Sequence, residues 1–295
     1  MTSEQLLAFG RLYRRAVGSL SLAKSEGIDE STIDYLNSLV GRAYGRIYRS
    51  ESRGIRSIPR FFARELPVTF RRSGRYIALG FGIFLLGAMV GFAVTAIRPG
   101  LADVVLGPSW ADRMDDYAEQ FRGEVNIIPE ELRPVFSSVI VTNNIQVAVV
   151  AFATGIFFGL GTIYALFANG LMMGMVSGGV QVRGVSGNFW GFVAPHGVIE
   201  LTAVFMAAGA GLMLGLALLS PGDLPRKVAL KSAAREAFKL VLGAASLLAV
   251  AAVIEAFFSP TATPNQLKFA FAACMAFLLI TYFGFAGSTP ETERA

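Results

Sequence analysis

Two ionisable residues lie in an apolar stretch of the chain. The run FWGFVAPHGVIELTAVF, residues 189–205, contains His196, the only histidine, and Glu200 four positions later. On a helix, positions i and i+4 share one face, so the imidazole and the carboxylate are expected to meet as a pair. An ionisable residue inside a membrane-spanning helix costs roughly 2.5 to 3.5 kcal/mol on insertion scales. We therefore expect both side chains to be buried against polar partners.

Such a pair is compatible with several kinds of site. The simplest is a hydrogen-bonded cluster that pins the packing of helices. A proton or solute pathway is the second, because histidine, with an unperturbed pKa of about 6.5, titrates near neutral pH. A metal centre fits less well, since zinc takes three or four protein ligands and a single histidine leaves only carboxylates to complete the set. An intramembrane hydrolase would need a nucleophile motif or a His-Glu-x-x-His helix, and neither occurs.

We therefore predict no catalytic residue, no metal and no cofactor, and expect the protein not to be an enzyme. Candidate partners for the pair come from other apolar segments, because polar side chains within spans commonly hydrogen-bond across helices. The predicted intramembrane polar cluster contains His196, Glu200, Asn143, Asn144, Asn169 and Glu255.

The composition indicates an integral membrane protein of the all-α class. Hydrophobic residues make up 54% of the chain, charged residues only 16%, and the mean hydropathy is +0.54. Soluble domains carry roughly 25% charged residues. The single cysteine, Cys274, excludes an intrachain disulfide, and no apolar run of signal-peptide type follows the first charges. The net charge of +5 is concentrated beside apolar segments, which favours anionic lipid over nucleic acid as a partner.

Six apolar segments are long enough to cross a bilayer. They are residues 76–97, 140–158, 162–181, 189–219, 238–257 and 267–286. The second and third are separated only by GLGT, residues 159–162, so one crossing followed by a re-entrant helix is the alternative. Fourteen Lys and Arg residues precede the first segment, whereas four lie in the loop that follows it. This bias predicts a polytopic bundle with both termini in the cytoplasm.

The chain is expected to contain three parts. Residues 1–75 form a basic cytoplasmic or interfacial region of amphipathic helices, in which RSIPRFFARELPVTFRRSGR either lies along the membrane surface or belongs to a small cytoplasmic bundle. Residues 76–286 form the transmembrane domain, whose acidic extracytoplasmic loop, 98–139, includes an amphipathic helix started by Ser109. Residues 287–295 form a short cytoplasmic tail. Between the fourth and fifth spans, a basic cytoplasmic loop covers residues 221–239.

Small residues recur at helical spacing. Glycine supplies tight turns and lets the backbones of membrane helices approach closely. We expect such roles for Gly155, Gly159, Gly161, Thr162, Gly170, Gly174, Gly178, Gly197, Gly211 and Gly215.

The stretches NNIQVAVVAFATGIFFGLGTIYALFANGLMMG, 143–174, and HGVIELTAVFMAAGAGLMLG, 196–215, resemble the stage II sporulation protein M family, also known as the DUF95 family. The resemblance covers the membrane part from the first span onward, and His-Gly-x-x-Glu is its most specific piece. It implies a polytopic membrane protein similar to an anchor that holds cell-wall hydrolases in spore-forming bacteria. The long basic N-terminal region and the acidic loop depart from a minimal anchor.

Two classes of function follow. A non-enzymatic membrane scaffold would use its glycine faces to form a homo-oligomer in the lipid of the cell membrane and would recruit envelope or cytoplasmic proteins. A transporter or channel would instead line a water-filled cavity with His196, Glu200 and the asparagines. The scaffold predicts that water is excluded from the surroundings of the pair, giving a dry bundle. The transporter predicts that the pair faces a water-filled cavity.

Overall fold

The computed structural model describes residues 3–47, 57–97, 104, 107, 109–122 and 133–287, and every regular element in these ranges is a helix. The predicted all-α class is therefore confirmed. The chain divides into two compact units, Met1–Ile58 and Pro59–Ala295. Most of the predicted loop 98–139, and the tail beyond residue 287, lie outside the described residues.

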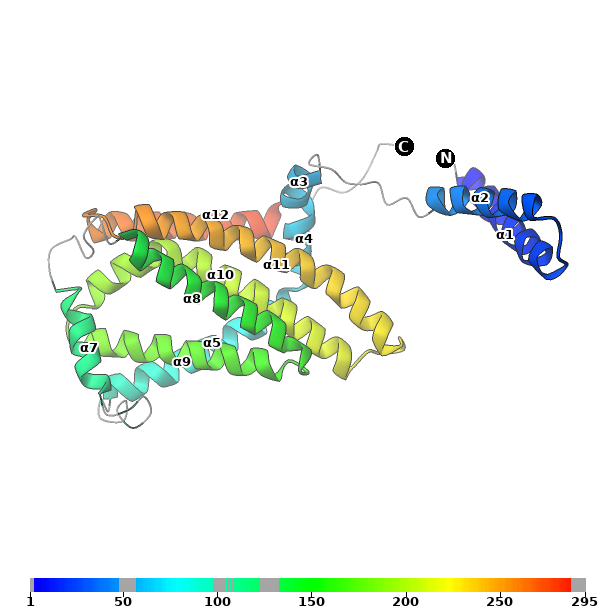
Figure 1. Ribbon diagram of the computed structural model, residues 1–295. Coiled ribbons are helices and arrows are strands. Elements are labelled where there is room, and N and C mark those ends of the chain that lie inside the picture. The colour runs from blue at the N-terminus through cyan, green and yellow to red at the C-terminus, as the bar shows by residue number, and fades with distance from the viewer. Residues whose placement is uncertain are drawn as a thin grey trace. The chain divides into compact units, whose positions relative to one another are not determined.

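The N-terminal unit is a helical hairpin, in agreement with the predicted amphipathic helices (Figure 1). Helices α1 (Ser3–Ser25) and α2 (Glu30–Ile47) are joined by a turn in which Gly27 has a φ of +64°, a common way to end a helix. Asp29 caps α2 by accepting a hydrogen bond of 3.0 Å from the backbone N–H of Thr32. Hydrogen bonds from the Ser31 hydroxyl and from Thr32 lower the pKa of the exposed Asp29 carboxyl. The capped start fixes where α2 begins.

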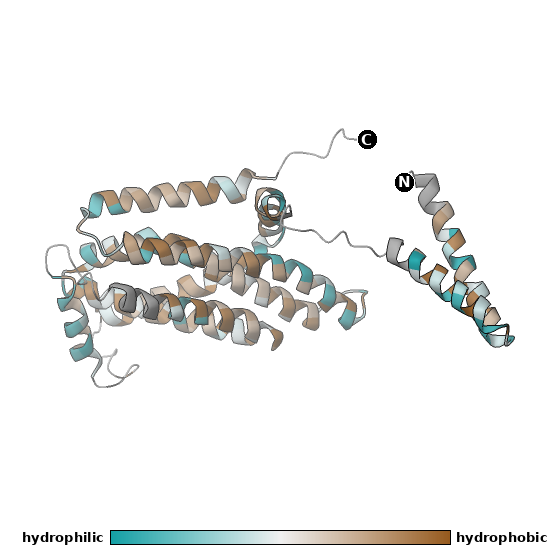
Figure 2. Cartoon of the chain, turned by 45° about the horizontal axis from the view of Figure 1, so that its top comes forward, coloured by the Kyte–Doolittle hydropathy of each residue, from teal (hydrophilic) through white to brown (hydrophobic). Residues whose placement is uncertain are grey.

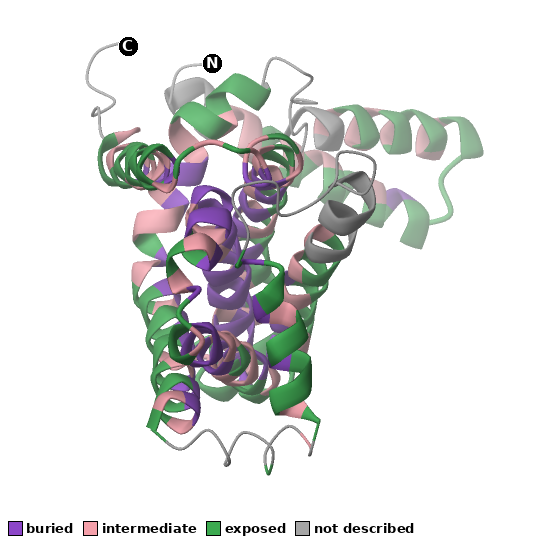
Figure 3. Ribbon diagram, turned by 90° about the vertical axis from the view of Figure 1, so that its left-hand side faces the viewer, coloured by how far each residue is buried: buried purple, intermediate pink, exposed green. Residues whose placement is uncertain are grey.

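Six long helices form the bundle of the second unit. They are α5 (Gly74–Ile97), α8 (Arg133–Ala153), α9 (Leu160–Val182), α10 (Ser186–Leu219), α11 (Arg226–Phe257) and α12 (Asn265–Phe285). Helix α10 contacts all five others. Buried positions gather inside the bundle, whereas its outward faces are exposed (Figure 3). Alanine and glycine dominate the buried run 207–211 of α10, because small side chains let several neighbours approach one helix.

Five helices, α5, α9, α10, α11 and α12, are long and apolar enough to cross a membrane. The sixth predicted span, residues 140–158, coincides with the end of α8 and with the short helix η3 (Thr154–Ile156). Its apolar helical stretch, Val141–Ile156, is shorter than the other five. The structure thus supports five crossings by length and composition, and the count of six, with both termini inside, stays a prediction.

The predicted turn at 159–162 lies slightly earlier than expected. Phe158 and Gly159 adopt left-handed backbone conformations, with φ of 56° and 83°, and α9 already begins at Leu160. Gly161 and Thr162 therefore belong to the helix rather than to the turn. The reversal brings α8 and α9 into contact as a hairpin. Two crossings, or one crossing followed by a re-entrant helix, are both compatible with this contact.

The predicted loop 221–239 is mostly helical, which corrects that expectation. Helix α11 begins at Arg226, so the connection from α10 is confined to residues 220–225. Alanine, lysine, arginine and glutamate dominate this part of the sequence, and all are strong helix formers. Figure 2 shows this hydrophilic first part of α11 continuing into its apolar remainder. The basic charges thus extend a spanning helix.

Residues 57–72 form one helical run made of α3 (Ser57–Arg60), the π-helical turn η1 (Phe61–Glu65) and α4 (Leu66–Arg72). The α4 part packs on the bundle. The ring of Phe70 stacks on Phe283 of α12 with centroids 4.0 Å apart, and Arg71 Nη1 donates a 2.8 Å hydrogen bond to the Phe283 carbonyl. Leu66 is buried in the main core. This basic, aromatic segment is therefore docked on the spanning helices and is not part of a separate bundle.

Candidate functional site

His196 lies in α10, where its side chain is almost fully buried at 3% exposure. Its Nδ1 shares a 2.8 Å hydrogen bond with the hydroxyl of Ser259, in the corner between α11 and α12. Phe192, one turn earlier, places its ring edge-on to the imidazole with centroids 5.5 Å apart. Pro195 directly before it is also fully buried. The histidine thus connects α10 to the α11–α12 corner.

Glu200 lies one turn after His196 and is directed to a different element. Its Oε2 accepts a hydrogen bond of 2.7 Å from Nδ2 of Asn144 in α8. Within the described part of the chain, no hydrogen bond or ion pair joins His196 to Glu200. The expected direct pairing is therefore corrected, because better partners on neighbouring helices lie within reach of each side chain. One face of α10 is tied to α8 by the carboxylate and to the α11–α12 corner by the imidazole.

The other predicted members of the cluster divide into two kinds. Asn143 is exposed, and Nδ2 of Asn169 donates to the Ala165 carbonyl of its own helix, so neither joins the cluster. Glu255 of α11 does join it, because its carboxyl group interacts electrostatically with that of Glu200. The cluster therefore contains four of the six predicted residues.

Two members of the cluster, Ser259 and Lys268, are absent from the set predicted from the sequence. The Lys268 side chain, 2% exposed near the start of α12, donates a 2.8 Å hydrogen bond from Nζ to the Ser259 carbonyl. A lysine that begins an apolar helix is a recognisable signal, since ionisable residues in spans are usually buried with a partner. Ser259 has no such signal in the sequence, because nothing in SPTATPNQ distinguishes it from an ordinary polar loop residue.

Helix α7 (Trp110–Glu119), predicted from SWADRMDDYAEQF, lies across the end of the bundle (Figure 1). Ser109 is its N-cap, although the Ser109 hydroxyl accepts a hydrogen bond from Arg113 instead of capping the backbone. Met114, Ala118 and Phe121 pack against residues at the end of α9 and the start of α10. Burial raises the pKa of Tyr117, on the same helix, to about 12, so its hydroxyl stays neutral.

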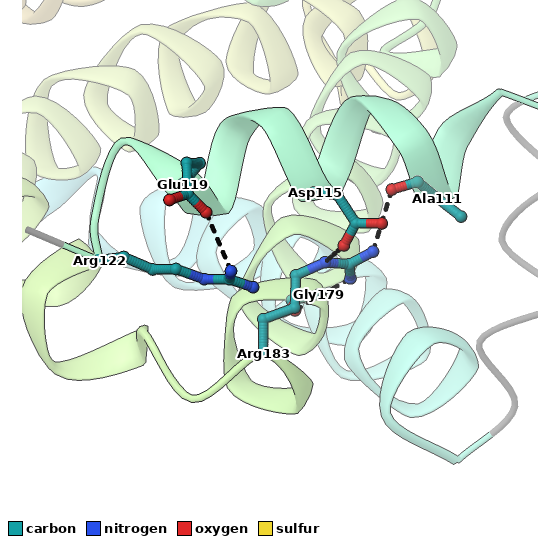
Figure 4. Close-up of polar contacts among 6 residues, drawn as sticks. All are labelled: Ala111, Asp115, Glu119, Arg122, Gly179 and Arg183. Carbon is teal, nitrogen blue, oxygen red and sulfur yellow. Dashed lines mark hydrogen bonds and ion pairs between the residues drawn. The ribbon is translucent and has the colours of Figure 1, made fainter.

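Arg183, directly after α9, holds α7 from the side (Figure 4). Its Nε donates to Asp115 Oδ1 at 2.6 Å and its Nη2 to the Ala111 carbonyl at 3.0 Å, while Nη1 donates to the carbonyl of Gly179 at 3.3 Å. Asn188 of α10 donates a further hydrogen bond to the Phe121 carbonyl. Polar contacts and an apolar underside therefore fix α7 on the bundle.

Most of the predicted glycines serve packing within the chain. An added Cβ would collide with backbone of a neighbouring helix at Gly155, Gly170, Gly174 and Gly211, with backbone of the turn at 158–159 at Gly215, with the Thr95 hydroxyl at Gly178 and with Thr154 at Gly161. Gly197 lies against Val193 of its own helix, and Gly159 supplies the turn. These roles confirm close helix contact, but the helices that meet belong to one protomer.

Thr162 closes the turn between α8 and α9. Its fully buried hydroxyl donates a 2.6 Å hydrogen bond to the Ala151 carbonyl. This carbonyl lies in the last turn of α8, where backbone carbonyls lack an N–H partner from the same helix. Thr162→Val keeps the shape and leaves this carbonyl unsatisfied, so we expect a loss of about 1–3 kcal/mol in the free energy of unfolding, measured by SDS titration of the protein in micelles. Thr281→Val is the matched control, since that hydroxyl bonds carbonyls of its own helix. Equal losses in both variants would contradict the assignment.

Chemically, the cluster combines two carboxyl groups, an imidazole, an ammonium group and an amide. Among the described residues, no group of three or more His, Cys, Asp or Glu side chains is arranged to hold a metal ion. Each of His196, Glu200 and Lys268 has a hydrogen-bond partner on another element or in the adjoining corner. The arrangement holds helices together, and within the described ranges the carboxylate of Glu255 has no hydrogen-bond partner.

Comparison with known proteins gives two family matches. The model of stage II sporulation protein M matches residues 80–260, more than half of the chain, and a domain of unknown function, DUF8413, matches residues 1–49. An uncharacterized protein of Methanocaldococcus jannaschii is 29% identical over 123 residues, which cover 41% of this chain and 69% of the relative. No solved structure matches significantly.

Proposed function

The chain belongs to the stage II sporulation protein M family of integral membrane proteins, and we propose that it is a non-enzymatic scaffold or anchor for envelope-associated partners. The buried polar cluster ties the helices of this scaffold together. The termini lie in the cytoplasm, as the distribution of basic residues predicts.

The observation that carries this proposal is the fixed position of α7. A helix outside the spanning segments is held by an apolar underside and by the contacts of Arg183 (Figure 4). Its opposite face is exposed and carries Asp112, Asp116 and Glu119, while Asp115 lies at the edge of that face, where it accepts the hydrogen bond from Arg183. A rigid, charged helix presents a defined surface, so a partner that binds it loses little conformational freedom.

The N-terminal hairpin offers a second surface. Several large apolar side chains on it are exposed, among them Leu12 at 62%, Leu22 at 57% and Tyr35 at 62%. Exposed apolar side chains on amphipathic helices commonly mark contact sites for proteins or membranes. We assign to this hairpin the recruitment of a cytoplasmic partner.

A transport function would predict a polar cavity at His196 and Glu200. A cavity of about 250 Å³ between α8 and α11 is lined by aliphatic and aromatic side chains, such as Val141, Phe152 and Leu248, and by none of the cluster residues. His196 and Glu200 are 3% and 7% exposed. These features favour a dry cluster, which supports the scaffold over the transporter.

Site-specific photo-crosslinking in native membranes tests the scaffold. A photoreactive residue in place of Asp116, on the exposed face of α7, is expected to give one discrete protein adduct. The matched control replaces Phe257, which is 77% exposed at the end of α11. Lipid or no adduct is expected there. Absence of an adduct at Asp116, or the same adducts from both positions, would argue against recruitment by α7.

A further inference from the structure

Glu255 is a buried carboxylate that has no hydrogen-bond partner among the described residues. Its side chain lies near the end of α11 and has 0% exposure. Glu200 of α10 lies close enough for the two carboxyl groups to interact electrostatically. A buried, unpaired carboxylate is costly, and a second carboxyl group beside it adds repulsion.

The protein groups around Glu255 do not offset this cost. On α10, His196 bonds Ser259, and on α12, Lys268 donates to a backbone carbonyl. Residues 141–153 of α8 contribute amides but no charge, and its Asn144 already donates to Glu200. Helix α4 contacts α11 at the other end, where Thr69 bonds Glu236. No ion pair in the described ranges involves Glu255. Among the described residues, therefore, none supplies a positive charge to the Glu255 carboxylate.

We propose that Glu255 and Glu200, with Asn144, form a binding site for a small cation between helices α8, α10 and α11. Glu255 contributes two unused oxygens, and Glu200 contributes Oε1, because its Oε2 accepts the hydrogen bond from Asn144. Carboxylate and amide oxygens are the ligands that hard metal cations prefer. A proton shared by the two carboxyl groups supplies the same positive charge and gives one of them a donor for the other. The shared chemistry is a cation held by carboxylate oxygen.

The cation has a structural consequence that is independent of recruitment by α7. The site joins α11 to the Glu200–Asn144 contact between α10 and α8, so its occupant stabilises the arrangement of three helices. A ligand that binds only the folded state raises the stability in proportion to the logarithm of its concentration above Kd. The melting temperature of the bundle should therefore depend on the cation that fills the site.

Thermal unfolding of the full chain in uncharged detergent tests this inference. One series varies pH in choline chloride with a chelator, and two others add Na⁺ or Mg²⁺ at fixed pH and ionic strength. For the wild-type protein we expect a saturable rise of several degrees in Tm in one series. A Tm that rises as the pH falls and does not respond to either salt identifies the proton as the occupant. A Tm that rises on addition of Na⁺ or Mg²⁺ identifies that ion. Glu255→Gln, which keeps the shape without the charge, should lose this response.

Glu119→Gln is the matched control, because that carboxylate is exposed on α7 and should leave the response unchanged. Equal responses of wild type and Glu255→Gln would overturn the proposal. If Glu255→Gln does not fold, Glu200→Gln replaces it, and infrared spectra of the wild type decide independently. A protonated carboxylic acid band that persists at neutral pH, or a carboxylate band that shifts on addition of Na⁺ or Mg²⁺, supports the site. Spectra with no protonated carboxylic acid band at neutral pH and no shift with either ion would refute it.

Discussion

Gly174→Leu is expected to prevent folding of the protomer itself. A Cβ at this position would collide with the carbonyl oxygen of Ala88, and the reciprocal glycines on α5, Gly87 and Gly91, face the backbone of α9 equally closely. Overpacking a core typically costs about 1–3 kcal/mol when side chains can give way. Here the colliding atoms belong to the backbone of the neighbouring helix, so α5 and α9 must separate. We expect the free energy of unfolding to fall by more than about 3 kcal/mol. Size-exclusion chromatography and circular dichroism in detergent would show aggregated or poorly folded protein.

The matched control for this variant is Gly82→Leu. Gly82 lies on the same helix pair, in α5, but is exposed and has no atom within 4 Å of an added Cβ. It should fold like the wild type. If Gly174→Leu instead gave a well-folded protein of smaller oligomeric size, the glycines would form an interface between protomers, as the sequence alone suggested.

This contrast shows where the sequence was informative. Glycines at 170, 174 and 178 predict that another helix approaches closely, because only small residues allow it. The spacing says nothing about whether that helix belongs to the same chain. The partner is α5, and its own glycines complete the contact. Homo-oligomerisation therefore stays a prediction without this support.

The polar cluster shows a second limit of prediction from the sequence, which concerns the partners of buried side chains. Helical spacing placed His196 and Glu200 on one face of α10, and their burial agrees with the expected need for partners. The partners themselves depend on the rotation of α8 and on the path of the α11–α12 corner, which no local pattern encodes. Asn144 and Asn143 are adjacent in sequence, yet only Asn144 faces Glu200. A difference of one position on a helix is a rotation of about 100°, enough to move a side chain from the bundle to its exterior.

Six long helices were expected in the bundle and six are present, but not all of their boundaries agree with the predicted ranges. The start of α9 after Gly159 and the extent of α10 agree with their predicted ranges within a few residues. The charges of the basic segment before the fifth span predict a loop, whereas the helix propensity of the same residues favours a helix. Charged helix formers continue a membrane helix into water without a break, so α11 extends beyond its apolar part.

Phe121→Ala is expected to release α7 while leaving the bundle folded. The Phe121 side chain is 3% exposed, and its ring contacts the rings of Tyr117, Phe189 and Phe192 with centroids 5.3, 5.5 and 6.2 Å apart. Truncating a buried phenylalanine costs about 3–5 kcal/mol. The contacts that remain include the apolar contacts of Met114 and Ala118, the hydrogen bonds of Arg183 and the hydrogen bond from Asn188 to the backbone of residue 121. Hydrogen exchange of residues 110–121, measured by mass spectrometry in detergent, should become much faster.

The exposed pair Arg122–Glu119 provides the control for this release. Its oxygen and nitrogen lie 2.9 Å apart, but both side chains are more than half exposed, and such surface pairs contribute only about 0–1 kcal/mol. Arg122→Ala should therefore leave the exchange of α7 nearly unchanged. Because the scaffold proposal depends on a rigid α7, Phe121→Ala should also abolish the Asp116 adduct without lowering the amount of protein in the membrane. An adduct that persists while α7 exchanges freely would mean that the partner binds α7 without needing its fixed position, and the apolar underside would then serve the bundle alone.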